Sequence, residues 1–600
     1  MPLTELVVAV RDGGLAKQGV LAALAGLVAD RVAPGIDRSR AGPLLDGTIP
    51  ASELTQPVPI ELLQPELLGD VLELLHDRDA RRRQGAFFTP HVTAALVVET
   101  ATHGWTWPER PRVCDPSCGG GAFLLAAGRA LERLGLERDR IVDEMLWGVD
   151  ADPLAVATTR AALAIWSGSA ERDAPPPYVP VPHVPVPHVV VGDTLRTGLE
   201  TWCPAAEPFD LVVGNPPFQS QLAVRTARTR KQAREMAERF GAASRAYADS
   251  STLFLLAASS MSDPKRGRFA LLLPESFLSA RDAREARRVV TEDASIVGIW
   301  LPDEAIFSAA VRVCVPVFES GSNTSTVSRW VDADATATGS FDASENVDES
   351  TWAPLVADLR GLPAAHLPST PVLSSVATAT AGFRDQFYGL RPFVRDRRPR
   401  DDRPVRLLTS GSIDLVNDLS PRRFVKFAGT SFNEPVVEME RLRQEDPRLA
   451  RWAERVLVPK VVVATQTRVV EVVVDEDGSV WPSVPVVAVA AVPERLWEIA
   501  AAIASPPISA LGLRRHAGAA LSGDAIKMSA KQVLDIPLPA DLAAWRKGAT
   551  HLHAASLAAA MGHGELWRDE LHAFGAAMCG AYDASEEVLA WWLARLSAYR

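Results

Sequence analysis

Residues 112–123 carry the sequence RVCDPSCGGGAF. The apolar start of this stretch predicts a β-strand, its glycines predict a tight turn, and the residues that follow predict a helix. Small residues let the backbone approach a ligand closely, and a helix N-terminus favours a carboxylate or a phosphate. The stretch is not a P-loop, because no Gly-Lys-Ser/Thr sequence follows. It therefore predicts a nucleotide-like binding turn between a strand and a helix.

Alternating strand and helix patterns extend outward from this turn, from about residue 84 to residue 320. Short apolar runs predict strands at residues 112–114, 146–149, 189–191, 211–213, 269–273 and 311–318. Helical segments lie between several of these runs. This order predicts an α/β fold, a Rossmann-like doubly wound sheet with helices on both faces.

Two further strand ends carry carboxylates. Asp150 ends the second predicted strand, where a carboxylate can accept both hydroxyl groups of a ribose. The alternative for Asp150 is a helix-capping or solvated aspartate. Asp193 follows the third strand and can accept a hydrogen bond from an adenine amino group, although taken alone it favours a structural role.

The sequence FDLVVGNPPF at residues 209–218 ends the fourth predicted strand. Two prolines make a stiff turn, which holds the Asn215 carboxamide and the Pro216 carbonyl in a fixed array. These two acceptors can bind both hydrogens of an exocyclic amine and aim its nitrogen at an electrophile. Phe218, after Pro217, offers a flat apolar face to a base taken out of its stack. The alternative is a purely structural turn, which the three preceding signals disfavour.

Taken in this order, the motifs resemble those of S-adenosylmethionine-dependent amino-methyltransferases of DNA. The closest resemblance is to the gamma-class adenine-N6 enzymes of restriction–modification and phage-defence systems. Four flanking phrases carry it further: residues 65–69 (PELLG), 83–90 (RQGAFFTP), 267–278 (GRFALLLPESFL) and 301–307 (LPDEAIF). The Asn-Pro-Pro-Phe sequence also occurs in ribosomal-RNA methyltransferases and in enzymes that methylate release factors, so the flanking phrases decide the assignment.

The resemblance implies roles for individual residues. Four would surround the methionine end of S-adenosyl-L-methionine: Thr89, Asp115, Ser117 and Gly119. Asp150 would hold the cofactor's ribose and Asp193 its adenine amine, while Phe254 would pack on the adenine ring. The target base would be held by the residues of the catalytic turn and by one later aromatic residue: Asn215, Pro216, Pro217, Phe218 and Phe307. Transfer would be direct, with a flipped base, no covalent intermediate and no metal.

The sequence also predicts how the chain is divided. The expected parts are a helical N-terminal region at 1–78, the methyltransferase domain at 79–320, a linker at 321–365, a mixed α+β target-recognition domain at 366–545 and C-terminal helices at 546–600. In the gamma arrangement, the region after the catalytic motif recognises the DNA target.

Composition limits the class of protein. The 600 residues are 47% hydrophobic and 23% charged, and the net charge is −11. This charge excludes a histone-like protein, but not an enzyme with one local basic groove. Two arginine-rich stretches, at 225–234 and 397–406, are candidates for DNA contact. Five cysteines cannot form a disulfide framework, and with no secretory signal or apolar span the sequence predicts a cytoplasmic protein without a membrane segment.

Several alternatives stay open. One is a methyltransferase-like subunit that senses DNA or cofactor without turnover, although intact Asn215 and Asp150 argue against it. Another is an RNA N-methyltransferase, which the large C-terminal region disfavours. A fused nuclease is disfavoured because Lys17, the one lysine in residues 1–80, lies in no Asp…Glu-x-Lys pattern. Double-stranded DNA is the implied partner, and a separate nuclease or specificity subunit is a further one.

Overall fold

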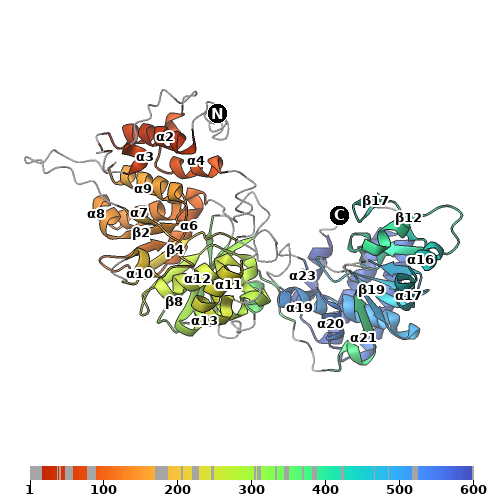
Figure 1. The fold of residues 1–600 in the computed structure, drawn as a ribbon. Coiled ribbons are helices and arrows are strands. Elements are labelled where there is room, and N and C mark those ends of the chain that lie inside the picture. Colours follow the sequence, from red (N-terminus) through yellow and green to blue (C-terminus); the bar gives the residue numbers. More distant parts are fainter. Residues whose placement is uncertain are drawn as a thin grey trace, which may run out of the picture. The chain divides into compact units, whose positions relative to one another are not determined.

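The computed structural model divides the chain into two compact units, Met1–Trp352 and Ala353–Arg600 (Figure 1). It describes residues 16–34, 36, 38, 42–46, 58–76, 89–168, 187–203, 207–218, 229–244, 249–302, 306, 312–331, 334–342, 351–365, 367, 370–381, 388–419, 424–464, 467–483, 486–516, 525–526 and 528–597. The division falls inside the stretch expected to be a linker, 321–365.

Unit 1 is built on a ten-stranded sheet with the order β10-β9-β7-β8-β5-β4-β1-β2-β3, in which β6 pairs with β8. Its strands are β1 (Val113–Asp115), β2 (Leu146–Asp150), β3 (His188–Val191), β4 (Leu211–Gly214), β5 (Arg268–Leu271), β6 (Leu273–Pro274), β7 (Ala294–Trp300), β8 (Val313–Ser320), β9 (Thr326–Val331) and β10 (Thr336–Asp342). β1 pairs in parallel with both β2 and β4. From β1 the chain first adds strands on one side, β2 and β3, and then crosses to add β4 on the other side. Open α/β sheets bind their ligands at such a switch point.

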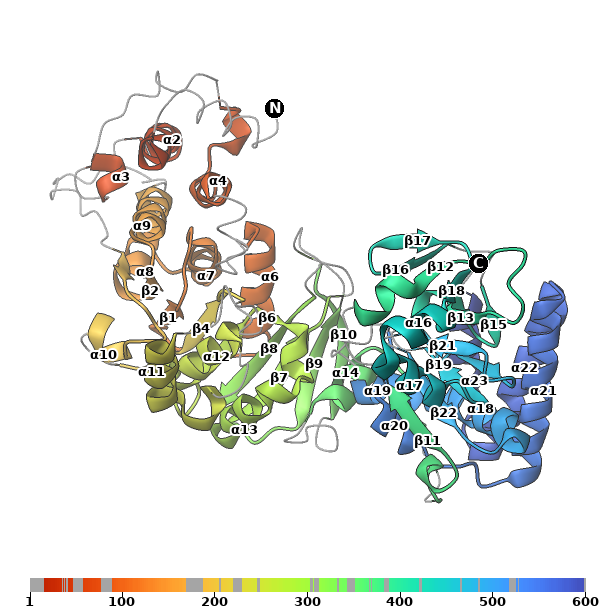
Figure 2. The same cartoon turned by 45° about the vertical axis from the view of Figure 1, so that its right-hand side comes forward.

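Helices cover both faces of this sheet. The helices of unit 1 are α2 (Lys17–Val32), α3 (Pro43–Asp46), α4 (Leu67–Leu75), α6 (His91–Thr102), α7 (Ala122–Arg133), α8 (Arg138–Glu144), α9 (Pro153–Gly168), α10 (Leu199–Trp202), α11 (Arg230–Phe240), α12 (Ser250–Met261) and α13 (Arg284–Asp293). Figure 2 shows α6, α7 and α9 on one side of the strands, and α12 and α13 on the other. The predicted doubly wound α/β fold is therefore confirmed.

The N-terminal helices form part of unit 1 rather than a separate layer of their own. Both α2 and α4 pack on α9, and their buried residues join the same hydrophobic core as the sheet. In α4, Leu68, Val71 and Leu72 are completely buried, as expected from their helical spacing.

The stretch 321–365 contributes regular structure on both sides of the division. β9 and β10 lie within it and pair with each other in antiparallel fashion, and β9 also pairs with β7. These strands extend the sheet of unit 1 beyond residue 320, where the methyltransferase domain was expected to end. The helix α14 (Ala353–Leu359) begins unit 2.

Unit 2 is a mixed α+β unit. One four-stranded sheet comprises β11 (Thr378–Ala381), β22 (Val487–Ala490), β19 (Lys460–Val463) and β20 (Val472–Asp475). A second comprises β12 (Val394–Asp396), β18 (Pro435–Val437), β13 (Val405–Leu408) and β21 (Val480–Pro482). Two short hairpins are formed by β14 (Ile413–Asp414) with β15 (Asn417–Asp418), and by β16 (Val425–Phe427) with β17 (Thr430–Phe432). The later helices are α16 (Met439–Glu445), α17 (Pro447–Val456), α18 (Leu496–Ala504), α19 (Pro506–His516), α20 (Ala530–Leu534), α21 (Leu542–Ala560), α22 (Gly564–Tyr582) and α23 (Glu586–Ser597).

A buried ion pair lies where the two sheets of unit 2 meet. Lys460 of β19 pairs with Asp475 of β20, and both side chains are almost completely buried. The Asp475 carboxylate also accepts the backbone N–H groups of Ser479 and Val480, each at 3.0 Å. Because Val480 begins β21, the carboxylate of Asp475 links the end of one sheet to the start of a strand in the other.

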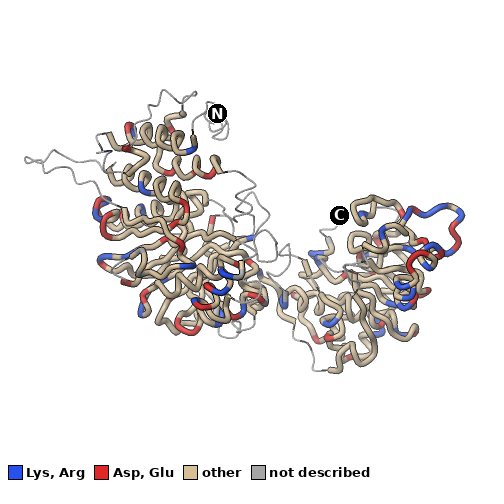
Figure 3. Tube along the Cα trace, viewed as in Figure 1, with Lys and Arg blue, Asp and Glu red and all other residues tan. Residues whose placement is uncertain are grey.

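Among the described helices, none taken singly has the length and apolar character needed to cross a membrane. The bent pair Pro493–Ala504 and Pro506–Arg515 meets that test by length and composition together. Lysine, arginine, aspartate and glutamate are interspersed over unit 1. In unit 2, a run of basic residues in the loop between β12 and β13 is followed by two acidic residues (Figure 3).

Candidate functional site

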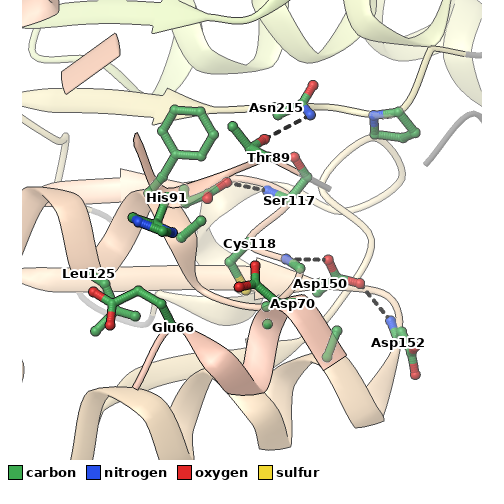
Figure 4. A pocket seen from close by; sticks show the side chains of 18 of the residues that line it. Glu66, Asp70, Thr89, His91, Ser117, Cys118, Leu125, Asp150, Asp152 and Asn215 are labelled. Carbon is green, nitrogen blue, oxygen red and sulfur yellow. Dashed lines mark hydrogen bonds between the residues drawn. The ribbon is translucent and has the colours of Figure 1, made fainter. Parts of the chain in front are cut away.

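A cavity of about 450 Å³ lies where the carboxyl ends of β1, β2 and β4 meet (Figure 4). Its lining comprises Glu66, Gly69, Asp70, His76, Thr89, His91, Asp115, Ser117, Cys118, Gly119, Gly120, Ala122, Phe123, Leu125, Asp150, Ala151, Asp152, Ala155, Asn215 and Pro217. Pockets for small ligands have volumes of this order. The cavity therefore lies at the switch point of the sheet and is lined by several carboxylates.

Asp115 stands at the end of β1 and is buried. Its Oδ1 accepts the backbone N–H of Ser117 at 3.0 Å. A Cβ atom on Gly214 would lie 2.5 Å from the same oxygen, so the end of β4 can approach this carboxyl only as glycine. Burial raises the pKa of Asp115 to about 8, the Ser117 N–H lowers it, and the neighbouring Asp150 raises it.

Asp150 connects two turns of the site. Its Oδ2 accepts the N–H of Gly119 at 2.9 Å, and its Oδ1 accepts the N–H of Asp152 at 2.9 Å. Burial raises the pKa of Asp150, while these backbone donors lower it. A carboxylate has about four lone-pair sites, so Asp150 keeps capacity for the two hydroxyl groups of a ribose. Asp152, whose carboxylate accepts the N–H of Leu154, serves the start of α9 instead.

The turn after β4 meets the segment before α6. The Asn215 carboxamide donates through Nδ2 to the Thr89 hydroxyl oxygen at 2.9 Å, across a sequence separation of 126 residues. Both residues line the cavity, as does Pro217. Phe218 is half-buried and packs against the hydrophobic core of unit 1. The structure thus brings Asn215 and Pro217 to one cavity with five of the predicted cofactor residues: Thr89, Asp115, Ser117, Gly119 and Asp150.

Other predicted site residues lie outside the cavity lining. The Asp193 carboxylate accepts the backbone N–H groups of Leu195 and Arg196, and so closes its own turn. Phe254 is buried in α12. Pro216 and Phe218 follow Asn215 but are not part of the lining. Phe307 lies outside the described residues, as do residues 83–88 of the flanking phrase.

One wall of the cavity comes from residues that carried no predicted role. Asp70 belongs to α4, and Glu66 directly precedes this helix. Glu66 also forms an ion pair with Arg129 of α7. Burial raises the pKa of Asp70, His91 lowers it, and Glu66 raises it. A signal for this wall was present in the sequence, because PELLG at residues 65–69 is one of the flanking phrases.

Two glycines bring this wall against the turn before α7. A Cβ atom on Gly120 would lie 2.4 Å from the Cα of Gly69, far closer than van der Waals contact. The helix α4 can therefore approach the glycine-rich turn only because both positions lack side chains. His76, just after α4, approaches Asp152 at 3.4 Å and holds the other end of the helix against the site.

Comparison with known proteins agrees with this geometry. Residues 63–347 match the family described as N-6 DNA Methylase. The fold is similar to that of the type IIL restriction-modification enzyme MmeI, solved in complex with DNA, at 13% identity and a TM-score of 0.64 over 99% of this chain and 98% of that chain. A comparison with the type IIG restriction endonuclease BpuSI gives 12% identity and a TM-score of 0.42 over 98% of this chain and 77% of that one. The matched residues include β1 to β10 and the helix α4, and thus the whole described cavity. Residues 63–347, just under half of the chain, are thus similar to the N-6 DNA methylases.

Proposed function

We propose that this chain is a site-specific DNA methyltransferase that transfers a methyl group from S-adenosylmethionine to the N6 amino group of adenine. The observation that carries the proposal is the position of Asn215. It ends β4 directly beside a carboxylate-lined cavity, in a chain that is similar to the N-6 DNA methylases over residues 63–347. A methyl acceptor held by Asn215 therefore lies next to the place where a methyl donor fits.

The cavity fits the cofactor in charge and in size. S-adenosylmethionine carries a sulfonium and an ammonium group, and the carboxyl groups of Asp70 from α4 and Asp150 from the end of β2 face the cavity. Asp150 would hold the ribose hydroxyls, and the turn at Ser117 and Gly119 would lie along the methionine part. When bound, the cofactor supplies an electrophilic methyl group.

The residues of the catalytic turn would contribute by positioning the target adenine. The Asn215 carboxamide oxygen and the Pro216 carbonyl would accept the two N6 hydrogens, which keeps the nitrogen lone pair directed at the methyl group. Flipping the adenine out of the duplex costs a few kcal/mol. Stacking on Phe218, at about 1–3 kcal/mol, would offset much of that cost. One N6 proton passes to water after transfer.

Unit 2 would recognise the DNA target. Its mixed α+β fold follows the catalytic unit in the chain, and it carries the arginine-rich loop between β12 and β13. Double-stranded DNA is the proposed partner, in restriction–modification or phage defence, with a separate nuclease or specificity subunit as a second partner. The DNA substrate and five free buried cysteines favour action in the cytoplasm.

Radiolabelled methyl transfer tests this function. The protein is incubated with labelled S-adenosylmethionine and unmethylated genomic DNA, with total RNA and protein extract in parallel. We expect label in DNA, recovered as N6-methyladenine, and at least about a hundredfold less label with Asn215→Ala. Asn323→Ala, at an exposed position between β8 and β9 in unit 1, is the matched control and should transfer normally. Label in RNA alone, or full transfer by Asn215→Ala, would refute the proposal.

A further inference from the structure

We infer that Thr89 is a positioning residue that sets the orientation of the Asn215 carboxamide. This inference rests on the proposed function and assigns Thr89 a role beyond the cofactor contact that the sequence predicted. The Asn215 Nδ2 group donates to the Thr89 Oγ1 atom at 2.9 Å, and both side chains line the same cavity (Figure 4).

Thr89 is held by a well-anchored helix. It directly precedes Pro90, whose carbonyl accepts the N–H of Ala94 in the first turn of α6. The helix α6 is anchored by its buried residues Ala94, Val97, Val98 and Ala101, and it contacts both β4 and α7. A hydroxyl group placed by such a rigid element has little freedom to leave its partner.

Asn215 is held equally firmly. It follows Gly214, whose carbonyl accepts the N–H of Leu272 at 3.0 Å, and every residue of β4 is buried. Two prolines follow it and stiffen the turn. The hydrogen bond therefore joins two fixed backbones, and it selects one of two orientations of a single rotatable amide.

The orientation matters because an amide has two different ends. Its NH₂ group only donates hydrogen bonds, and its oxygen only accepts them. With Nδ2 directed to the Thr89 hydroxyl, Oδ1 occupies the opposite end of the amide. The reversed amide would present donors to the N6 amine, which is itself a donor. A hydroxyl can pair with either end of an amide, so Thr89 selects the orientation in which Asn215 accepts a hydrogen of the target base when its own proton is donated to another group in the cavity.

The hydroxyl also has a second function available. A threonine hydroxyl can accept one hydrogen bond and donate its own proton in another. Thr89 can therefore accept from Asn215 and donate toward an anionic group in the cavity at the same time. The Thr89 hydroxyl oxygen then contacts both the anionic group in the cavity and the turn that holds Asn215.

The test compares Thr89→Val, which removes the hydroxyl at nearly constant shape, with Thr89→Ser, which keeps it. Methyl transfer is measured at saturating S-adenosylmethionine and saturating DNA, and the Kd for S-adenosylmethionine is measured separately by calorimetry. We expect Thr89→Val to lower kcat about five- to tenfold, which corresponds to the free energy that one hydrogen bond contributes. Thr89→Ser should stay within about twofold of the wild type.

Thr100→Val is the matched control. Its hydroxyl donates to the Val97 carbonyl within the same helix and does not line the cavity, so its kcat should be unchanged. If Thr89→Val does not fold, Thr89→Ala replaces it as a second variant without the hydroxyl.

A Thr89→Val enzyme with wild-type kcat and a weakened Kd for the cofactor would overturn the inference, since Thr89 would then be a cofactor ligand alone. Equal losses in Thr89→Val and Thr89→Ser would overturn it too. Methyl transfer by the wild-type protein separates the two proposals. If the wild type methylates DNA and Thr89→Val matches it, only the inference fails; if the wild type methylates no DNA, the proposed function fails first.

Discussion

The buried carboxyl of Asp115 is an unusual choice for the end of a central strand. Removal from water raises its pKa to about 8, because only one backbone donor, the Ser117 N–H, stabilises the charged form. In the unfolded chain the same group has a pKa near 3.8. Between these two values the folded state holds a proton that the unfolded state has lost.

This difference predicts how stability depends on pH. The folded state binds more protons between about pH 4 and pH 8, so the contribution of Asp115 to the free energy of unfolding falls as pH rises through that window. Asp115→Asn keeps the acceptor for Ser117 and cannot ionise. We expect its free energy of unfolding, relative to wild type, to rise by up to about 1.4 kcal/mol per pH unit from pH 5 to pH 8 and to level off above, and its Tm to rise in the same way. Thermal unfolding of the cofactor-free proteins measures this, and a Tm difference independent of pH would contradict it.

Single residues also show where the sequence was sufficient and where it was not. Asp150 and Asp193 both follow a strand and looked alike as candidate ligands. In the structure Asp150 lines the cavity, whereas the Asp193 carboxylate accepts two N–H groups of its own turn. The difference depends on the backbone path after each strand, which a strand-end position in the sequence does not specify.

At the scale of elements, the contact between α4 and the glycine-rich turn leaves no room for an added side chain. The backbone φ of Gly120 is negative, so alanine would cause no backbone strain there. The obstacle is the space that its Cβ atom needs. That atom would lie 2.4 Å from the Cα of Gly69 and would force α4 away from the cavity.

We expect Gly120→Ala to destabilise the protein by about 1–3 kcal/mol and to weaken cofactor binding at least about tenfold. Gly580→Ala is the matched control, because nothing lies within 4 Å of the added atom on the surface of α22. It should be neutral or slightly stabilising. Chemical denaturation and calorimetry with S-adenosylmethionine measure both quantities. Unchanged cofactor affinity in Gly120→Ala would show that the α4 wall is not needed for binding.

The elements that the sequence predicted well are those at the centre of the sheet. β1, β2 and β4 are almost entirely buried, so they read as short continuous apolar runs. β7 and β9 were not predicted, because each alternates buried with partly exposed residues and β9 lies in a Ser- and Thr-rich stretch. The helix α4 was predicted, but its place in the site was not, since periodicity gives the buried face of a helix and not its partner.

For the whole molecule, the net charge of −11 opposes binding to DNA, so local basic surface must supply the attraction. We propose the loop between β12 and β13 as this surface. Arg395 binds both oxygens of Asp401, at 2.6 and 2.8 Å, and the pairing lowers the pKa of Asp401. The anchored loop exposes Arg398, Arg400 and Arg403, for which no ion pair occurs within the part of the chain that the structure describes.

Replacing these three arginines together with alanine tests that surface. Each phosphate contact contributes about 0.9 to the slope of log K against log salt concentration. We expect the triple variant to bind duplex DNA with a slope shallower by about 2–3, and to bind S-adenosylmethionine normally. The control is a triple alanine variant of the paired surface arginines Arg140, Arg266 and Arg288 in unit 1. A slope equal to that of the wild type would exclude the loop from the DNA interface.

The strand order has a consequence for synthesis on the ribosome. β1 is an inner strand whose two neighbours come from different parts of the chain: Val113 pairs with Leu146 on one side and with Leu211 on the other. At roughly 5–20 residues per second, translation needs several seconds to pass from β1 to β4. During that interval the growing chain exposes one edge of β1 to the crowded interior of the cell, where unpaired edges recruit other chains. The strand order that creates the site therefore also leaves β1 unpaired on one side until residue 214 emerges.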